Sequence, residues 1–136
     1  MRKFFSALLV LFVAAALTLT ACGKKSGPVV GNDENGKKLY ESKTLGSNSA
    51  EGCVSCHNYY ESKGKNDKAP YTAGTATRAE TRVAGMTAEE YIHESIINPN
   101  AYVVENYKEG DMYQKWKAEL SEQQIADLVA YLLTEK

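Results

Sequence analysis

The sequence lacks an excess of charge of either sign, since its 136 residues hold 16 Lys and Arg against 17 Asp and Glu. Nucleic-acid-binding domains normally carry a basic excess, so this composition argues against such a partner. A charged share of 24% beside a hydrophobic share of 43% is typical of a globular protein rather than a disordered one. The length allows one domain and leaves little room for a second.

Two further patterns are missing. No stretch alternates convincingly between apolar and polar residues, as a half-buried strand would, and no internal repeat is visible. The sequence instead contains apolar residues at helical spacing. We therefore expect an all-α fold.

Acidic residues are absent from residues 1–21, where Arg2 and Lys3 precede an uncharged, apolar run. This pattern is typical of a secretory signal, or of a membrane-spanning anchor. The run ends at Leu19-Thr20-Ala21-Cys22, which resembles the bacterial lipoprotein signal. We expect cleavage before Cys22, lipidation of this cysteine, and anchoring at the outer, periplasmic or extracytoplasmic face of a membrane. The alternative is an uncleaved transmembrane helix.

Cleavage there would leave 115 residues (136 less 21), with 14 basic residues against 17 acidic ones. Residues 22–34 are rich in Gly, Pro and polar residues, without helical periodicity. We interpret them as a flexible membrane tether. Residues 35–136 would then form the working domain.

Cysteine is scarce, and only Cys53 and Cys56 remain once Cys22 is assigned to lipid. They lie in Cys53-Val54-Ser55-Cys56-His57, and C-x-x-C-H is the attachment sequence of c-type haem. Each thiol adds across one haem vinyl group, and the adjoining His57 is placed to bind the iron. The pattern therefore predicts one covalent haem c.

Other uses of this cysteine pair fit less well. A redox-active dithiol would normally follow a strand of a βαβ pattern, which is not seen. A zinc site needs four ligands. The chain has no second cysteine pair, and the remaining candidates are His93 and scattered carboxylates. A disulfide between Cys53 and Cys56 would close too short a loop to stabilise a domain of this size much.

Three helices are predicted around this motif. Residues 35–42 form a short candidate with Leu39 and Tyr40 on its apolar face. Thr87-Ala88-Glu89-Glu90 is a capping box that opens a helix to about Ile97, and Asn98-Pro99 ends it. Ser121-Glu122-Gln123-Gln124 is a second box. The helix after it has one apolar stripe, formed by Ile125, Leu128, Val129, Leu132 and Leu133.

With these elements the chain resembles class I monohaem cytochromes c over residues 35–136. The resemblance rests on Gly36-Lys37-Lys38-Leu39-Tyr40, on the C-x-x-C-H motif, on Pro70 and on Leu128-Val129-Ala130-Tyr131-Leu132. It implies a small fold of about three to five helices around the haem. It also implies that Gly36 and Tyr40 meet Leu128 and Tyr131 where the terminal helices cross, and that the Pro70 carbonyl accepts a hydrogen bond from the proximal histidine.

The second axial ligand is implied by the same resemblance. Met112 lies in a predicted loop, residues 110–116, where the family places its distal methionine, although Tyr113 follows it where relatives often have proline. Met86 and His93 are the other candidates, and an open site is a further one. Met86 is better explained as a hydrophobic contact before the capping box, and His93 as an ordinary helix residue. Arg78, Arg82, Tyr102 and Trp116 are candidate donors to haem propionates, or else ordinary surface and packing residues.

These patterns predict an electron carrier and not an enzyme, since no set of acid, base and nucleophile is evident. The expected partners are a membrane, through lipidated Cys22, and redox proteins of a respiratory or photosynthetic chain. One alternative is a fixed subunit of a quinol-oxidising complex, because residues 98–104 resemble the monohaem lipoprotein subunit of alternative complex III. The other is a haem enzyme or gas sensor with an open distal site.

Overall fold

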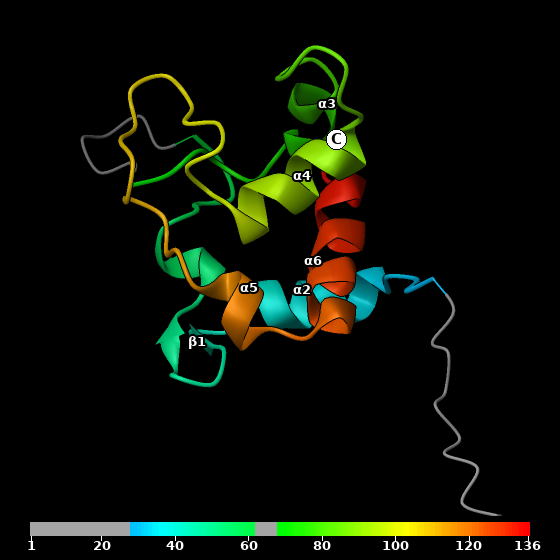
Figure 1. Ribbon diagram of the computed structural model, residues 1–136, viewed down its shortest axis with the longest axis vertical. Coiled ribbons are helices and arrows are strands. Elements are labelled where there is room, and N and C mark those ends of the chain that lie inside the picture. The colour runs from blue at the N-terminus through cyan, green and yellow to red at the C-terminus, as the bar shows by residue number, and fades with distance from the viewer. Residues whose placement is uncertain (1–27, 62–67) are drawn as a thin grey trace, which may run out of the picture.

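The computed structural model describes residues 28–61 and 68–136, and the predicted signal and Cys22 lie outside this part. The described residues are mostly helical and form five α-helices and one two-stranded hairpin (Figure 1). In chain order the elements are α2 (Asp33–Tyr40), β1 (Thr44–Leu45), β2 (Ala50–Glu51), the 3₁₀ turn η2 (Cys53–Ser55), α3 (Thr75–Ala79), α4 (Ala88–Ile97), α5 (Trp116–Glu119) and α6 (Glu122–Thr134). The expectation of a small, mainly helical fold is confirmed.

Both predicted capping boxes are present. The Thr87 hydroxyl accepts from the Glu90 backbone N–H while the Glu90 carboxylate accepts from the Thr87 N–H, and α4 begins there. Ser121 and Gln124 make the same reciprocal pair at the start of α6. Each box satisfies two backbone donors that a helix end otherwise leaves unpaired, which explains why these two starts were readable from the sequence.

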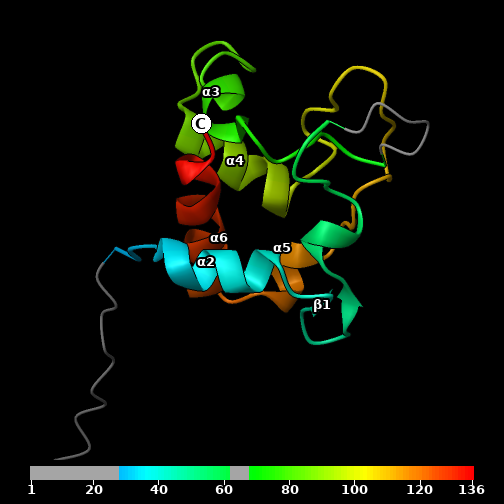
Figure 2. The same ribbon diagram turned by 180° about the vertical axis from the view of Figure 1, so that it is seen from behind.

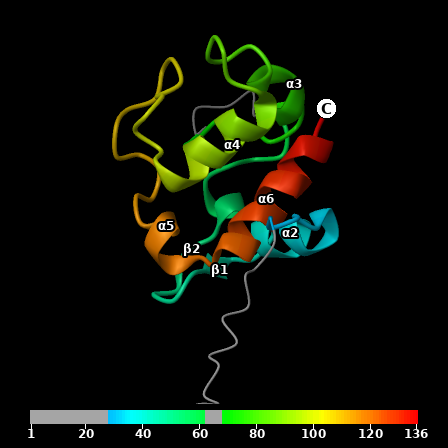
Figure 3. The ribbon, with the colours of Figure 1, turned by 45° about the vertical axis from the view of Figure 1, so that its right-hand side comes forward.

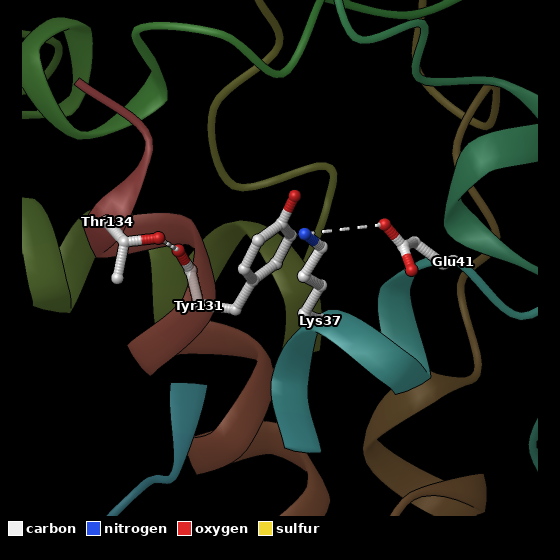
Figure 4. Close-up of polar contacts among 4 residues, drawn as sticks. All are labelled: Lys37, Glu41, Tyr131 and Thr134. Carbon is white, nitrogen blue, oxygen red and sulfur yellow. Dashed lines mark hydrogen bonds and ion pairs between the residues drawn. The ribbon is translucent and has the colours of Figure 1, made fainter. Parts of the chain in front are cut away.

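Helices α2 and α6 cross at a steep angle, with α2 lying across α6 when the molecule is seen from behind (Figure 2). The contact depends on Gly36, because a Cβ there would lie 1.8 Å from the Asp127 carbonyl oxygen. One turn later the rings of Tyr40 and Tyr131 pack with centroids 5.3 Å apart. Figure 4 shows Tyr131 on α6 together with the Lys37–Glu41 ion pair of α2. Both charged side chains of this pair are exposed, so the pair contributes little to the stability of the fold.

The start of the domain differs from the prediction, which assigned residues 22–34 to the tether. Asn32 caps α2, and its backbone N–H donates to the buried Asp127 carboxylate at 2.8 Å. Gln123 donates to both the Val30 carbonyl and Asp127, each at 2.8 Å. The folded domain therefore begins near Val30, because long-range partners on α6 hold a segment that has no periodicity of its own.

The core is formed where α4, α5 and α6 meet the end of α2. The predicted stripe of α6 is largely correct: Ile125, Leu128 and Val129 are buried, while Leu132 and Leu133 are partly buried against the same cluster. Tyr131 is buried as well, because it faces α2. From α4 the buried residues are Ile92 and Ile96, and from α5 the core takes Trp116.

The short elements were not predicted. Helices α3 and α5 have five and four residues, too few to show a period, and the hairpin strands have two each. Trp116, expected in a loop, begins α5 and is buried, with 4% of its surface exposed. Such elements are fixed by tertiary contacts rather than by local pattern.

We expect Gly36→Ala to lower the free energy of unfolding by at least about 2 kcal/mol, as overpacking against a backbone does. The gain in helix propensity, about 1 kcal/mol, is too small to compensate. Denaturant unfolding of the holoprotein measures the effect. Asn35→Ala, at an exposed position of the same helix, is the matched control and should be neutral or slightly stabilising. Equal stabilities of Gly36→Ala and the wild type would contradict the close approach of α2 and α6.

Candidate functional site

The C-x-x-C-H segment forms one tight turn directly after the hairpin. The His57 backbone N–H donates to the Cys53 carbonyl at 2.9 Å, and the Cys56 N–H donates to the same oxygen at 3.2 Å. Gly52 precedes the turn, and its backbone N–H donates to the carbonyl oxygen of Lys43. A Cβ at position 52 would lie 1.8 Å from the Ser42 carbonyl oxygen. The hairpin therefore fixes where the turn begins, and Cys53, Cys56 and His57 all line one cavity.

The His57 ring is held by Pro70. Its Nδ1–H donates to the Pro70 carbonyl oxygen at 2.8 Å, the contact that the family resemblance implied. Burial lowers the pKa of His57, while the bond to Pro70 opposes that change. The imidazole is therefore neutral at neutral pH, and the Nε2 lone pair is left for a metal.

Cys53 and Cys56 are not joined in a disulfide, and both are partly buried. Burial raises the pKa of the Cys53 thiol to about 11. Redox-active C-x-x-C pairs depend instead on a lowered thiol pKa, because the thiolate is their nucleophile. The environment of Cys53 thus argues against a dithiol oxidoreductase. No group of three or more His, Cys, Asp or Glu that could hold a metal occurs within the described residues.

The cavity next to this turn has a volume of about 210 Å³ and is lined mainly by apolar and aromatic side chains. Its lining residues come from segments throughout the described domain, from α2 to α6. Lining residues far apart in the chain are Tyr40, Leu45, Ala79, Ile92, Ile96, Val103, Val104, Trp116, Leu128 and Leu132. A flat, apolar macrocycle with two vinyl groups and an iron fits this donor set and lining.

Met112 lines the same cavity and is partly buried against the core cluster. Its backbone carbonyl accepts from the Gln114 side chain at 2.6 Å, which fixes the chain next to it. The rival candidates lie elsewhere: neither Met86 nor His93 lines the cavity, and His93 is exposed on α4. The geometry brings Met112, and not the other two, to the cavity that His57 enters.

Arg78 is one of the candidate donors to haem propionates, but its guanidinium already has partners within the chain. It donates to the Ala73 carbonyl at 2.6 Å and to the Tyr71 carbonyl at 2.5 Å, and it lies 4.2 Å from the centre of the Tyr71 ring. These bonds hold the segment that presents Pro70 to His57, a role that no sequence pattern revealed. Arg78, Arg82 and Tyr102 line both the main cavity and a smaller polar pocket, and Trp116 is buried in the main cavity wall.

Comparison with known proteins agrees with this geometry. The family model described as cytochrome c matches residues 34–136, well over half of the chain. No curated protein and no solved structure gave a match. In the part of the chain that the structure describes, no helix has the length and apolar character needed to cross a bilayer. With its single C-x-x-C-H turn opening into one apolar cavity, the chain belongs to the cytochrome c family, whose members carry covalently bound haem c.

Proposed function

We propose that this chain is a membrane-anchored monohaem cytochrome c that passes single electrons within a respiratory or photosynthetic chain. The observation that supports this function best is that Cys53, Cys56, His57 and Met112 line one apolar cavity. Haem c, when bound, supplies an iron that changes between the ferric and ferrous states by one electron.

The residues of the chain would have separate tasks. Cys53 and Cys56 would hold the haem through thioether bonds, and His57, oriented by Pro70, would be one iron ligand. Met112 would be the second iron ligand, and a thioether ligand favours the ferrous state. The apolar lining keeps water away, and fixed ligands keep the structural change on reduction small.

Anchoring through lipidated Cys22 is part of the proposal. Because Val30 is bonded to α6, seven residues (23–29) separate the lipidated position from the folded domain. The eight Cα-to-Cα steps from Cys22 to Val30 span at most about 28 Å when fully extended. The domain would therefore remain near the membrane surface, where membrane-bound redox partners present their cofactors.

A redox titration of the detergent-extracted holoprotein tests the carrier function. We expect one reversible one-electron transition, and little or slow binding of carbon monoxide to the reduced protein at neutral pH, because Met112 fills the distal position. Rapid and complete binding of carbon monoxide would contradict this expectation and favour a haem enzyme or gas sensor.

The same site would serve a fixed subunit of a quinol-oxidising complex of the alternative complex III type. The stretch that resembles such subunits, residues 98–104, supplies Pro99, Tyr102, Val103 and Val104 to the cavity wall. Purification after mild detergent extraction distinguishes the two forms. A mobile carrier should be isolated alone, whereas a subunit should co-purify with integral membrane or multihaem proteins.

A further inference from the structure

Tyr113, which follows Met112 directly, is tied to the next helix. Its hydroxyl donates a short hydrogen bond to the Oε1 atom of Glu119, the last residue of α5. Its ring packs edge-on against Trp116, with centroids 4.7 Å apart. Trp116 in turn lines the haem cavity beside Met112. The position of Met112 therefore depends on where α5 holds Tyr113.

Glu119 also reaches across to the hairpin that precedes Cys53. The Asn48 side-chain amide donates to Glu119 Oε1 at 2.7 Å, and the Asn48 backbone N–H lies 3.4 Å from Oε2. Asn48 lies in the turn between β1 and β2, which Figure 3 shows next to α5. One carboxylate thus joins the segment carrying Met112 to the hairpin that leads into the cysteine turn.

The close approach of Glu119 requires glycine in the hairpin turn. Gly46 has φ +79°, and a Cβ at this position would lie 2.5 Å from Glu119 Oε2. The hydrogen bonds from Tyr113 and Asn48 lower the pKa of the Glu119 carboxyl, so it is ionised at neutral pH. Hydrogen bonds to a charged acceptor are stronger than those between neutral groups.

We propose that Glu119 is a positioning residue, which fixes Met112 at the haem cavity by joining the Tyr113 hydroxyl to Asn48. This inference rests on the proposed function, in which Met112 is the second axial ligand. Glu119 does not line the cavity and would act only through Tyr113. Loss of the hydrogen bonds that join Tyr113 to Asn48 through Glu119 would leave the fold in place but make Met112 easier to displace from the iron.

Competition by imidazole for the ferric iron of the holoprotein measures this hold directly, because imidazole must displace the distal ligand. We expect Glu119→Ala and Tyr113→Phe each to tighten imidazole binding by about tenfold, because each removes the hydrogen bond between the Tyr113 hydroxyl and the charged carboxylate. The sulfur-to-iron absorption band should be lost at a lower temperature in both. Glu119→Gln, which keeps an acceptor for Tyr113, should show a smaller change. In the double variant the effects should not add, since both changes break one link.

Two control variants separate positioning from general destabilisation. Glu109→Ala removes an exposed carboxylate three residues before Met112 and should leave imidazole binding unchanged. Gln123→Ala breaks the bond between α6 and Val30, and should lower stability without changing imidazole binding.

The outcomes also separate this inference from the function on which it rests. If the wild type shows the sulfur-to-iron band while Glu119→Ala and Tyr113→Phe bind imidazole within twofold of it, the positioning role is overturned and Met112 ligation stands. If the wild type lacks the band, Met112 ligation fails, and the positioning role fails with it.

Discussion

The double variant Cys53→Ala/Cys56→Ala is expected to lose all covalently attached haem, while each single variant keeps at most one thioether bond. The two sulfur atoms are not joined to each other, both residues line the cavity, and the turn between them is closed by two hydrogen bonds to the Cys53 carbonyl. Intact-mass measurement of the denatured protein shows the attached haem directly. We also expect the double variant to be strongly destabilised, because the cavity is lined largely by apolar side chains that the haem would cover.

Cys22→Ser is the matched control for this experiment, because it changes the third cysteine of the chain. Under our proposal it keeps the haem but moves the protein out of the membrane fraction, since lipid is no longer attached. The two sets of variants should therefore lose different properties. Haem that stays covalently bound in the Cys53→Ala/Cys56→Ala variant would refute the assigned attachment site.

Met112→Ala is expected to abolish the sulfur-to-iron absorption band of the oxidised protein and to let carbon monoxide bind rapidly after reduction. The reduction potential should fall, because methionine and histidine together favour the ferrous state more than histidine with water does. The fall should be an appreciable part of the roughly 0.8 V that axial ligands span in haem proteins. Optical redox titration measures both properties in one sample.

Met86→Ala and His93→Ala are the controls for Met112, since these residues were the other candidate ligands and do not line the cavity. Both variants should keep the band and a potential close to that of the wild type. If the band survives in Met112→Ala but disappears in Met86→Ala, or if the wild type has no such band, the distal ligand has been assigned to the wrong residue.

The parts of the fold that were predictable carry a complete local signal. Helices α4 and α6 begin at capping boxes, and α6 also shows its apolar stripe at helical spacing. Helix α5 has neither a capping box nor an apolar stripe in its four residues. It is held instead by Trp116, which is buried in the core, and by Glu119, which is hydrogen-bonded to the hairpin. The buried position of Asp127 was equally invisible, because its carboxylate accepts from the backbone N–H of Asn32, at the other end of the domain, as well as from Gln123 on its own helix.

The candidate site was predictable to the extent that its chemistry is contiguous in the chain. Cys53, Cys56 and His57 lie within five residues, so their pattern alone indicates haem attachment. Pro70 and Met112 came from the family resemblance, and the structure brings both to His57 or its cavity. The bonds of Arg78 and Glu119 that support these residues arise only from packing, which no spacing rule records.

The central claim is that one haem is covalently bound at Cys53 and Cys56. Its most direct test is mass spectrometry of the purified membrane protein after denaturation and acidic extraction, with fragmentation of the peptide that contains both cysteines. We predict that this peptide carries one haem and no free thiol. A peptide without haem, with Cys53 and Cys56 either free or joined in a disulfide, would contradict the account.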